Sequence, residues 1–242
     1  MARLFITSYQ KSGTHQIMPA FGITADIVDR SHNGTHNLPD YVGLENTIDK
    51  DGILVTVNAL EEFYKGKFGH VSYLPEYAVA IQKKPTKVLF NIRDPRDIIV
   101  SEYYNMMKLF SRGNSDHALW NFRMKDSRTV YGSGDPIKYL IEFASCRWLN
   151  WLGWMKHDFV YTVKYEDLRL NGIETLEKIK EFLAPEITIN TAWNFEHLKP
   201  RHGNPTFRRG VPGEWKDVFT DEHKKQAAEQ LGATIRKLGY TL

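Results

Sequence analysis

The stretch RLFITS-YQKSGTH, residues 3–15, decides the fold of this chain. Its first six residues are apolar enough to predict a strand, and a glycine-containing loop then leads into a helix predicted from Ser12 to about Phe21. A strand, a loop and a helix in this order suit a phosphate group, because backbone N–H groups and the positive helix end face the anion. Lys11 adds a movable charge. This is not the nucleotide-triphosphatase loop, in which Gly-Lys-Ser/Thr closes the motif, because here Lys-Ser precedes Gly-Thr.

Strands and helices alternate along the rest of the sequence. Further strands are predicted at 68–73, 87–92 and 159–164, and helices from Pro75 and at 95–109, 136–156, 176–183 and 221–238. This alternation predicts an α/β fold, with a mostly parallel central sheet flanked by helices and a P-loop-like phosphate loop after the first strand. Ligands bind at the carboxyl ends of the strands in such sheets. Residues 24–66 and 110–135 are irregular, and without a repeat or a linker a single domain over residues 1–242 is predicted.

Composition narrows the classes of function. A formal charge of +3 over 242 residues is too small to favour general nucleic-acid binding. The single cysteine excludes an intrachain disulfide. The sequence shows neither an apolar stretch near the roughly 20 residues of a membrane span nor a signal-peptide pattern at its start. A cytoplasmic protein without a membrane partner is therefore expected.

Charge is distributed unevenly along the chain. Residues 21–62 contain eight acidic side chains against Arg30 and Lys50. From Lys199 to the end, nine Lys and Arg residues stand against five Asp and Glu residues. The C-terminal part therefore suits an anion, and the early part does not.

Residues 93–101, RDPRDIIVS, form a second candidate for anion binding. Arg93 lies at the end of a predicted strand and Ser101 about two turns into the next helix, so both could reach one phosphate. The alternative is a surface salt bridge between Arg93 and Asp97, in which Asp94 or Asp97 also stabilises the helix dipole.

A third candidate is the sequence FRRGVPGEWK at residues 207–216, which has two arginines before a glycine. The two arginines either clamp an anion or belong to a solvated basic loop.

Two other patterns are interpreted structurally. Trp148, Trp151 and Trp154 stand three residues apart and favour a core-facing stripe over a binding cage. His32 and His36 have a spacing that metal ligands also use, but their Gly/Asn loop offers no evident third ligand. No metal is expected.

Together these elements resemble the family of sulfotransferases that depend on 3′-phosphoadenosine-5′-phosphosulfate (PAPS), most closely its cytosolic, small-molecule branch. Residues 11–14, KSGT, are similar to the family's 5′-phosphosulfate loop, and residues 93–101 resemble its 3′-phosphate motif. Residues 165–168, YEDL, match its Tyr-Glu-Asp-hydrophobic segment. Residues 208–216 match its Arg-Lys-Gly-x-x-Gly-Asp-Trp-Lys motif with two conservative changes. The resemblance covers residues 3 to about 238.

The resemblance implies an enzyme that transfers the sulfuryl group of PAPS in line to a hydroxyl or amine, without a metal. Its implied catalytic residues are Lys11, His70 and Ser101. Those implied to bind the phosphates are Lys11, Ser12, Gly13, Thr14, His15, Arg93, Ser101, Arg208, Arg209 and Gly210. Tyr165 and Phe195 resemble the residues that sandwich adenine, and Lys11 would neutralise charge on the leaving oxygen.

The resemblance also implies a histidine as general base. That histidine stands about twenty residues before the 3′-phosphate arginine in the family, and His70 stands twenty-three before Arg93. A structural role for His70 is the alternative, because Phe68 stands where the family often has lysine. His15 competes for the role of base, and Gln16 replaces a tryptophan that stacks on adenine. The family's dimerisation motif is not matched, so the oligomeric state is left open.

Three other functions are weighed against this one. A phosphoryl transferase on a related fold is disfavoured, because neither a Gly-Lys-Ser/Thr ending nor a Walker-B Asp is evident. A catalytically inactive nucleotide-binding or scaffolding protein is the second alternative, and a carbohydrate sulfotransferase is the third. The acidic excess of residues 21–62 favours a small, neutral or cationic acceptor, such as a secondary metabolite, over a polyanionic glycan.

Overall fold

In the computed structural model the chain divides into two compact units. The first contains residues 1–93 and 150–199, and the second contains residues 94–149 and 200–242. The residues that the structure describes are 3–9, 11–13, 17–21, 68–69, 73, 75–82, 86–111, 135–185, 189–191 and 210–242. That the two units make a single domain stays a prediction.

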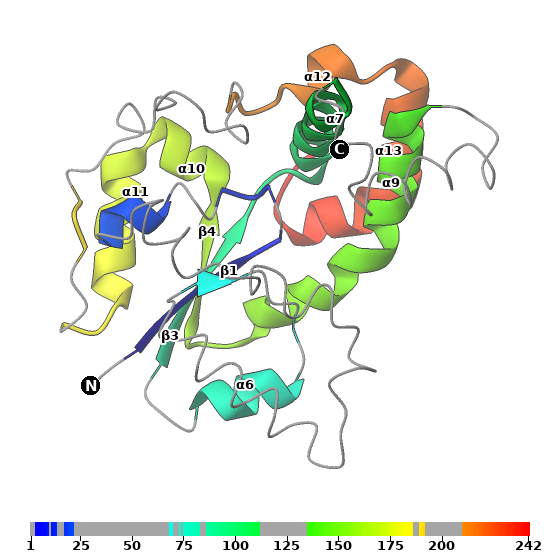
Figure 1. Ribbon diagram of the computed structural model, residues 1–242. Coiled ribbons are helices and arrows are strands. Elements are labelled where there is room, and N and C mark those ends of the chain that lie inside the picture. The colour runs from blue at the N-terminus through cyan, green and yellow to red at the C-terminus, as the bar shows by residue number, and fades with distance from the viewer. Residues whose placement is uncertain are drawn as a thin grey trace. The chain divides into compact units, whose positions relative to one another are not determined.

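Within the described residues, the first unit is built on a four-stranded parallel sheet (Figure 1). In the sheet order β2-β1-β3-β4, its strands are β2 (Phe68–Gly69), β1 (Arg3–Ser8), β3 (Thr86–Ile92) and β4 (Val160–Lys164). β1 pairs with β3 along its whole length, and its last residue, Ser8, lies beside Asn91. The predicted α/β fold with a parallel central sheet is confirmed.

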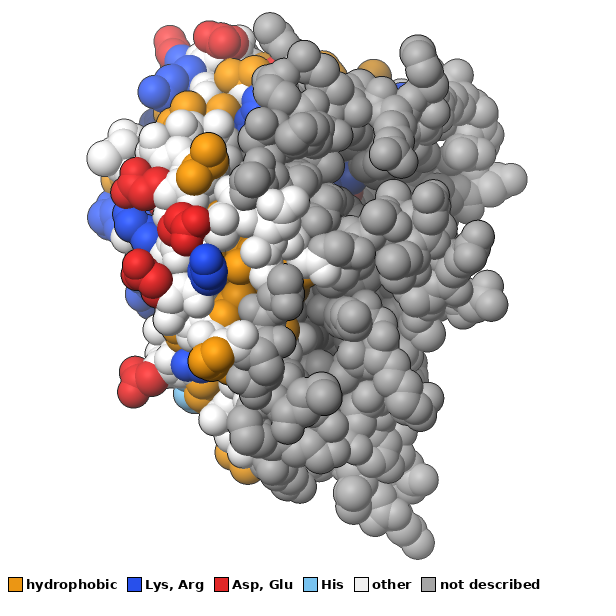
Figure 2. Space-filling view, turned by 90° about the vertical axis from the view of Figure 1, so that its left-hand side faces the viewer, with side chains coloured by type: hydrophobic (Ala, Val, Ile, Leu, Met, Phe, Trp, Pro, Cys, Tyr) orange, Lys and Arg blue, Asp and Glu red, His pale blue; other side chains and the backbone are white. Residues whose placement is uncertain are grey.

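Helices accompany this sheet in the first unit. They are the 3₁₀ helix η1 (Met18–Phe21) and the α-helices α6 (Pro75–Gln82), α10 (Tyr165–Leu170) and α11 (Gly172–Phe182). α10 continues directly from β4, and both α10 and α11 pack against that strand. Figure 2 shows acidic and basic side chains intermixed on the face where α10 and α11 lie, and Glu174 and Lys178 pair there at 2.7 Å. This face has mixed charge rather than charge of one sign.

The two faces of the sheet pack against different elements. Phe90 on β3 stacks against Trp151, with ring centroids 6.4 Å apart. Lys87, on the opposite face, lies 4.3 Å from the centroid of the Phe182 ring at the end of α11. Because successive residues of a strand point to opposite faces, Asn91 shares the face of Lys87.

The second unit, as far as it is described, is helical. Its α-helices are α7 (Pro95–Ser111), α9 (Pro136–Arg147), α12 (Trp215–Val218) and α13 (Asp221–Lys237). α9 packs against both α7 and α13. Ala227, Leu231 and Ile235, spaced by four residues, form the buried stripe of α13. The helices predicted at 95–109 and 221–238 are confirmed.

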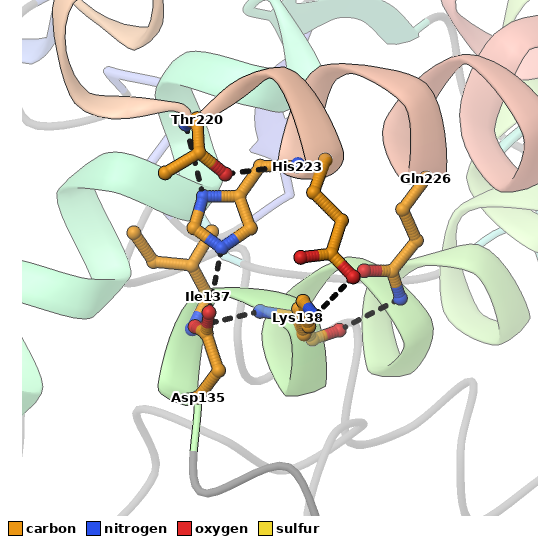
Figure 3. A network of polar contacts seen from close by, with 7 residues as sticks. Asp135, Ile137, Lys138, Thr220, His223 and Gln226 are labelled. Atoms are coloured by element: carbon orange, nitrogen blue, oxygen red, sulfur yellow. Dashed lines mark hydrogen bonds and ion pairs between the residues drawn. The ribbon is translucent and has the colours of Figure 1, made fainter.

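A polar network joins the start of α9 to the start of α13 (Figure 3). Asp135 caps α9, and its Oδ1 accepts hydrogen bonds from the N–H groups of Ile137 and Lys138 at 2.9 and 3.3 Å. Its Oδ2 lies 2.7 Å from Nε2 of His223, whose Nδ1 accepts from the N–H of Thr220 at 3.2 Å. Burial alone would raise the pKa of Asp135, but the hydrogen bonds from His223 and the two amides outweigh it and lower that pKa below its ordinary value. The network therefore favours a charged Asp135 and ties the two helices together.

The 3₁₀ helix η2 (Trp148–Lys156) follows α9 directly. Its tryptophans, each at most 4% exposed, are Trp148, Trp151 and Trp154. Three residues make one turn of a 3₁₀ helix, so a spacing of three places them along one side. The predicted core-facing stripe is confirmed, whereas the predicted single helix at 136–156 is wrong in its second half.

Tyr73 packs against η2 in the first unit. Its ring lies 5.4 Å from that of Trp154, and its hydroxyl lies 3.0 Å from Nε2 of His157. Gly153 provides the space, because a Cβ at that position would overlap the Tyr73 ring. Tyr73 is thereby anchored to the core of the first unit.

Three other predicted elements differ in extent. The helix predicted from Ser12 does not begin there, because Gly13 has a φ of +92°, outside the helical region. The strand predicted at 68–73 is described only at 68–69, where it pairs with β1. The helix predicted at 176–183 belongs to α11, which begins earlier, at Gly172. Asn171, with φ −134° and ψ 47°, separates α11 from α10.

Two features are absent from these described ranges. No helix within them is long and apolar enough to cross a membrane. No three His, Cys, Asp or Glu side chains within them are grouped so that they could hold a metal ion. His32 and His36 lie outside them.

Candidate functional site

The turn after β1 has an unusual backbone. Lys11 has a φ of +66° and Gly13 a φ of +92°, and the N–H of Ser12 donates to the carbonyl oxygen of Tyr9 at 3.2 Å. Positive φ is uncommon for a residue with a side chain, and two such residues around Ser12 turn the chain sharply. Turns that mix helical and left-handed residues are typical of backbone anion sites. The backbone of the turn therefore agrees with the predicted phosphate loop.

Arg93 connects the end of β3 to this turn. Its Nη1 donates to the carbonyl oxygen of Lys11 at 3.3 Å, and its guanidinium carbon lies 4.2 Å from the centroid of the Tyr165 ring. Arg93 is 6% exposed and Tyr165 is 1% exposed. A guanidinium over an aromatic face is stabilised by about 0.5–2 kcal/mol. The ring therefore fixes the orientation of Arg93.

These side chains lie at one edge of the sheet. Carboxyl ends of parallel strands share an edge, and Lys11 follows β1, Arg93 follows β3 and Tyr165 follows β4. The chain leaves β1 towards β2 but leaves β3 towards β4, in opposite directions along the sheet. Open α/β sheets bind their ligands in the crevice at such a switch point. Topology and side chains therefore indicate the same place.

Three buried side chains of the first unit have polar atoms without a hydrogen-bond partner among the described residues. These atoms are Oγ of Ser12, Nε of Arg93, and Nδ2 and Oδ1 of Asn91. An unpartnered buried polar group costs about 1–3 kcal/mol, and native proteins satisfy most such groups. The phosphate groups of a bound nucleotide would give Ser12 and Arg93 the partners that they lack.

Arg93 is also a buried cation with no acidic partner in the described part of the chain. Its contacts there are the Lys11 carbonyl and the Tyr165 ring, and neither bears a net charge. Arginine is almost never fully buried unless it is paired. Both Arg93 and Asp97 are buried, so a contact between them would not be a surface salt bridge. A bound anion is the partner that fits.

Asp97 instead organises the C-terminal motif within the second unit. Its Oδ2 accepts a hydrogen bond from the N–H of Gly213 at 2.6 Å, and its Oδ1 accepts one from the N–H of Trp215 at 3.0 Å. Next to it, the Arg96 guanidinium lies 3.8 Å from the Trp215 ring centroid and pairs with Asp94 at 2.7 Å. Two motifs that are far apart in the sequence are thereby joined.

The structure describes about half of the predicted site residues. It brings together, in the first unit, Lys11, Ser12, Gly13, Arg93 and Tyr165. In the second unit, Ser101 lies on α7, and Gly210 precedes α12 with a φ of +61°. Outside the described residues lie Thr14, His15, His70, Phe195, Arg208 and Arg209. The role of each residue stays a prediction, including the adenine contact of Tyr165.

Sequence patterns alone miss two polar residues with specific surroundings. Asn91 interrupts the apolar strand Val-Leu-Phe-Asn-Ile, and that interruption is itself a signal. Asp97 resembles an ordinary acidic residue in the first turn of a helix, which the helix dipole favours. Its bond to Gly213 spans 116 residues, so no local pattern could show it.

Comparison with known proteins decides the family. The sulfotransferase domain family matches residues 2–239, nearly the whole chain. The chain belongs to the PAPS-dependent sulfotransferase family. The family resemblance seen in the four motifs is confirmed.

Curated sulfotransferases agree with this assignment. Sulfotransferase 1A1 of Rattus norvegicus is 29% identical over 174 residues, covering 62% of this chain and 55% of that protein. Sulfotransferase 6B1 of Danio rerio is 30% identical over 165 residues, covering 63% and 52%. Flavonol 3-sulfotransferase of Flaveria bidentis is 25% identical over 273 residues, covering 96% and 82%. In the first two alignments the chain spans about half the length of its relatives.

Solved sulfotransferase structures share the fold. A mouse sulfotransferase was crystallised with PAP (3′-phosphoadenosine-5′-phosphate). It superposes with a TM-score of 0.54 and 21% sequence identity, covering 97% of this chain and 84% of that one. Retinol dehydratase, solved with androsterone and PAP, gives a TM-score of 0.50 and 17% identity, covering 99% and 82%. These similarities extend over nearly all of the present chain.

Proposed function

We propose that this sulfotransferase transfers the sulfuryl group of PAPS to a hydroxyl or amine of a small acceptor. The observation that carries the proposal is the turn at residues 11–13, to which the buried Arg93 is hydrogen-bonded at the switch point of the sheet. The unpartnered atoms of Ser12 and Arg93 fit the phosphate groups of a nucleotide. Bound PAPS supplies an activated sulfuryl group, so the protein has mainly to position the partners and stabilise charge.

Each predicted residue has a definite task in this proposal. Lys11 neutralises the charge that develops on the leaving oxygen. The 5′-phosphosulfate is held by Lys11, Ser12, Gly13, Thr14 and His15. The 3′-phosphate is held by Arg93, Ser101, Arg208, Arg209 and Gly210. Tyr165 and Phe195 enclose the adenine, and no metal takes part.

The acceptor hydroxyl also needs a base, and we assign this task to His70. β2 ends at Gly69, which lies beside Thr7 of β1, and His70 is the next residue in the sequence. Imidazole takes up a proton near neutral pH, as a general base must. His15, which stands in the loop after β1, is the competing candidate.

The nucleotide preference tests this proposal directly. PAP, the 3′,5′-bisphosphate left after transfer, is expected to raise the melting temperature far more than AMP or ATP-Mg does. In this proposal Arg93, Arg208 and Arg209 bind the 3′-phosphate, and each charge-assisted hydrogen bond contributes about 1.5–3 kcal/mol. Thermal-shift titrations with the three nucleotides give the comparison. Equal shifts from AMP and PAP would contradict the proposal, and a larger shift from ATP-Mg would favour a phosphoryl transferase.

The charge of the acceptor is a second expected outcome. The acidic excess of residues 21–62 would attract a cationic or neutral small molecule and repel a polyanion. In a competition assay, a cationic alcohol is expected to be sulfated in preference to a uronate-bearing glycan, more strongly at low salt than at moderate salt. Preference for the glycan at either salt concentration would move the protein to the carbohydrate branch.

The remaining assignments rest on the same reasoning. We propose a single domain in the cytoplasm, acting on a small molecule rather than on nucleic acid or at a membrane. An activity screen with PAPS across phenols, alcohols, amines and glycans, with products detected by mass spectrometry, tests the catalytic function. Sulfation of any of these acceptors would exclude an inactive scaffolding protein.

A further inference from the structure

Asn91 is a polar residue in the middle of an apolar strand. It is 1% exposed, and neither amide atom has a hydrogen-bond partner among the described residues. Its strand neighbours Leu89, Phe90 and Ile92 are all buried and apolar. Asparagine is depleted in strands, and an unpartnered carboxamide makes the protein without ligand less stable than an apolar residue would. The position therefore needs an explanation other than packing.

The register of the sheet places Asn91 next to the crevice. Asn91 is the last residue but one of β3, and Arg93 follows directly after the strand ends at Ile92. On β1, Asn91 pairs with Ser8, the last strand residue before the turn that contains Ser12. On β4 it pairs with Val163, two residues before Tyr165. Asn91 and its partners on the neighbouring strands therefore lie near the carboxyl ends of their strands, next to the loops that contain Ser12 and Tyr165.

We propose that Asn91 is a further ligand-binding residue, whose carboxamide donates a hydrogen bond to a phosphate oxygen of the nucleotide. The inference rests on the proposed function, because it needs a nucleotide in the crevice. The carboxamide offers two N–H donors and bears no charge, so it adds hydrogen bonds without adding to the repulsion between Lys11 and Arg93. Ser12, Asn91 and Arg93 are then three buried donors that the phosphate groups of one nucleotide satisfy.

The test uses the isosteric replacement Asn91→Leu, measured with and without PAP. Removing an unpartnered amide from the core is expected to raise the melting temperature of the protein without ligand by a few degrees. The same change is expected to weaken PAP binding about tenfold or more by calorimetry, because a hydrogen bond to a charged phosphate is lost. A structural residue would not change stability and affinity in opposite directions.

Controls separate this effect from damage to the sheet. Thr86→Val changes a buried polar residue at the far end of the same strand and is expected to leave PAP affinity unchanged. Asn91→Val repeats the test with a residue suited to strands, in case leucine does not fold. Titration with AMP locates the contact: an equal loss for AMP and PAP indicates the 5′ end, and a loss for PAP alone indicates the 3′-phosphate.

Three outcomes would overturn the inference. Unchanged PAP affinity in Asn91→Leu would make Asn91 a buried residue without a ligand. Weaker binding together with a lower melting temperature would attribute the loss to the fold. Equal weakening in Thr86→Val would attribute it to the strand. A wild-type protein that binds no PAP would instead refute the proposed function, so the two failures are distinguishable.

Discussion

Replacing His70 with alanine is expected to lower kcat for a hydroxyl acceptor by about 10²–10⁴-fold, with PAP affinity nearly unchanged. The acceptor hydroxyl must lose its proton during transfer, and the variant has no imidazole there to accept it. Product formation measured by mass spectrometry gives kcat, and calorimetry gives PAP affinity. The pH dependence adds a second readout, since the limb of the rate profile that belongs to the imidazole should disappear in the variant.

His15→Ala is the matched variant, because it removes the other candidate imidazole. It is expected to weaken PAP binding if His15 contacts the phosphosulfate, and to lower kcat less than His70→Ala does. If His15→Ala abolishes turnover and His70→Ala is mild, the base has been assigned wrongly. A hydroxyl acceptor is essential, because an amine that is already deprotonated would blunt either effect.

The strands and long helices could be predicted because their causes are local. The apolar run of residues 87–92 forms β3, and Pro95 opens α7. In α13 the apolar stripe is regular, and Thr220 caps its first turn. The parallel sheet could be predicted from the alternation of such elements. The phosphate loop was proposed from residues that are adjacent in sequence, and it stays a prediction.

The boundaries that failed depend on backbone conformations and on contacts made elsewhere. Gly13 adopts a left-handed conformation that the sequence permits but does not require, and this excludes a helix starting at Ser12. Within η2, Gly153 leaves room for Tyr73, which stands eighty residues earlier in the sequence. Helical periodicity alone reveals neither the conformation of Gly13 nor the contact between Tyr73 and Gly153.

The candidate site was predictable where a motif is contiguous and not where it is assembled. Lys11, Ser12 and Gly13 form one such motif, and the structure gives them the expected turn. The contact of Arg93 with the Tyr165 ring joins residues that follow two different strands, and it is visible only in the fold. A polar residue within an apolar strand, as at Asn91, is a signal that the sequence itself contains.

Asp97→Ala is expected to lower the free energy of unfolding by about 2–5 kcal/mol. The carboxylate is buried and accepts two backbone hydrogen bonds, from Gly213 at 2.6 Å and from Trp215 at 3.0 Å. Alanine accepts neither bond, and each partly buried N–H left without a partner costs about 1–3 kcal/mol. Urea unfolding followed by circular dichroism measures the change.

Two further variants define the cause of this loss. Asp97→Asn keeps one acceptor oxygen but presents an N–H₂ group to the other amide, so it is expected to lose a substantial part of the same free energy. Asp221→Ala removes an exposed carboxylate whose contact with Lys224, at 3.6 Å, lies on the surface, and should change stability by less than about 1 kcal/mol. If Asp97→Ala and Asp221→Ala unfold at the same urea concentration, the buried carboxylate does not hold the C-terminal motif. A loss confined to Asp97 would show that the turn at Gly213 depends on a residue of the Arg93–Ser101 motif, so that one motif supports the other.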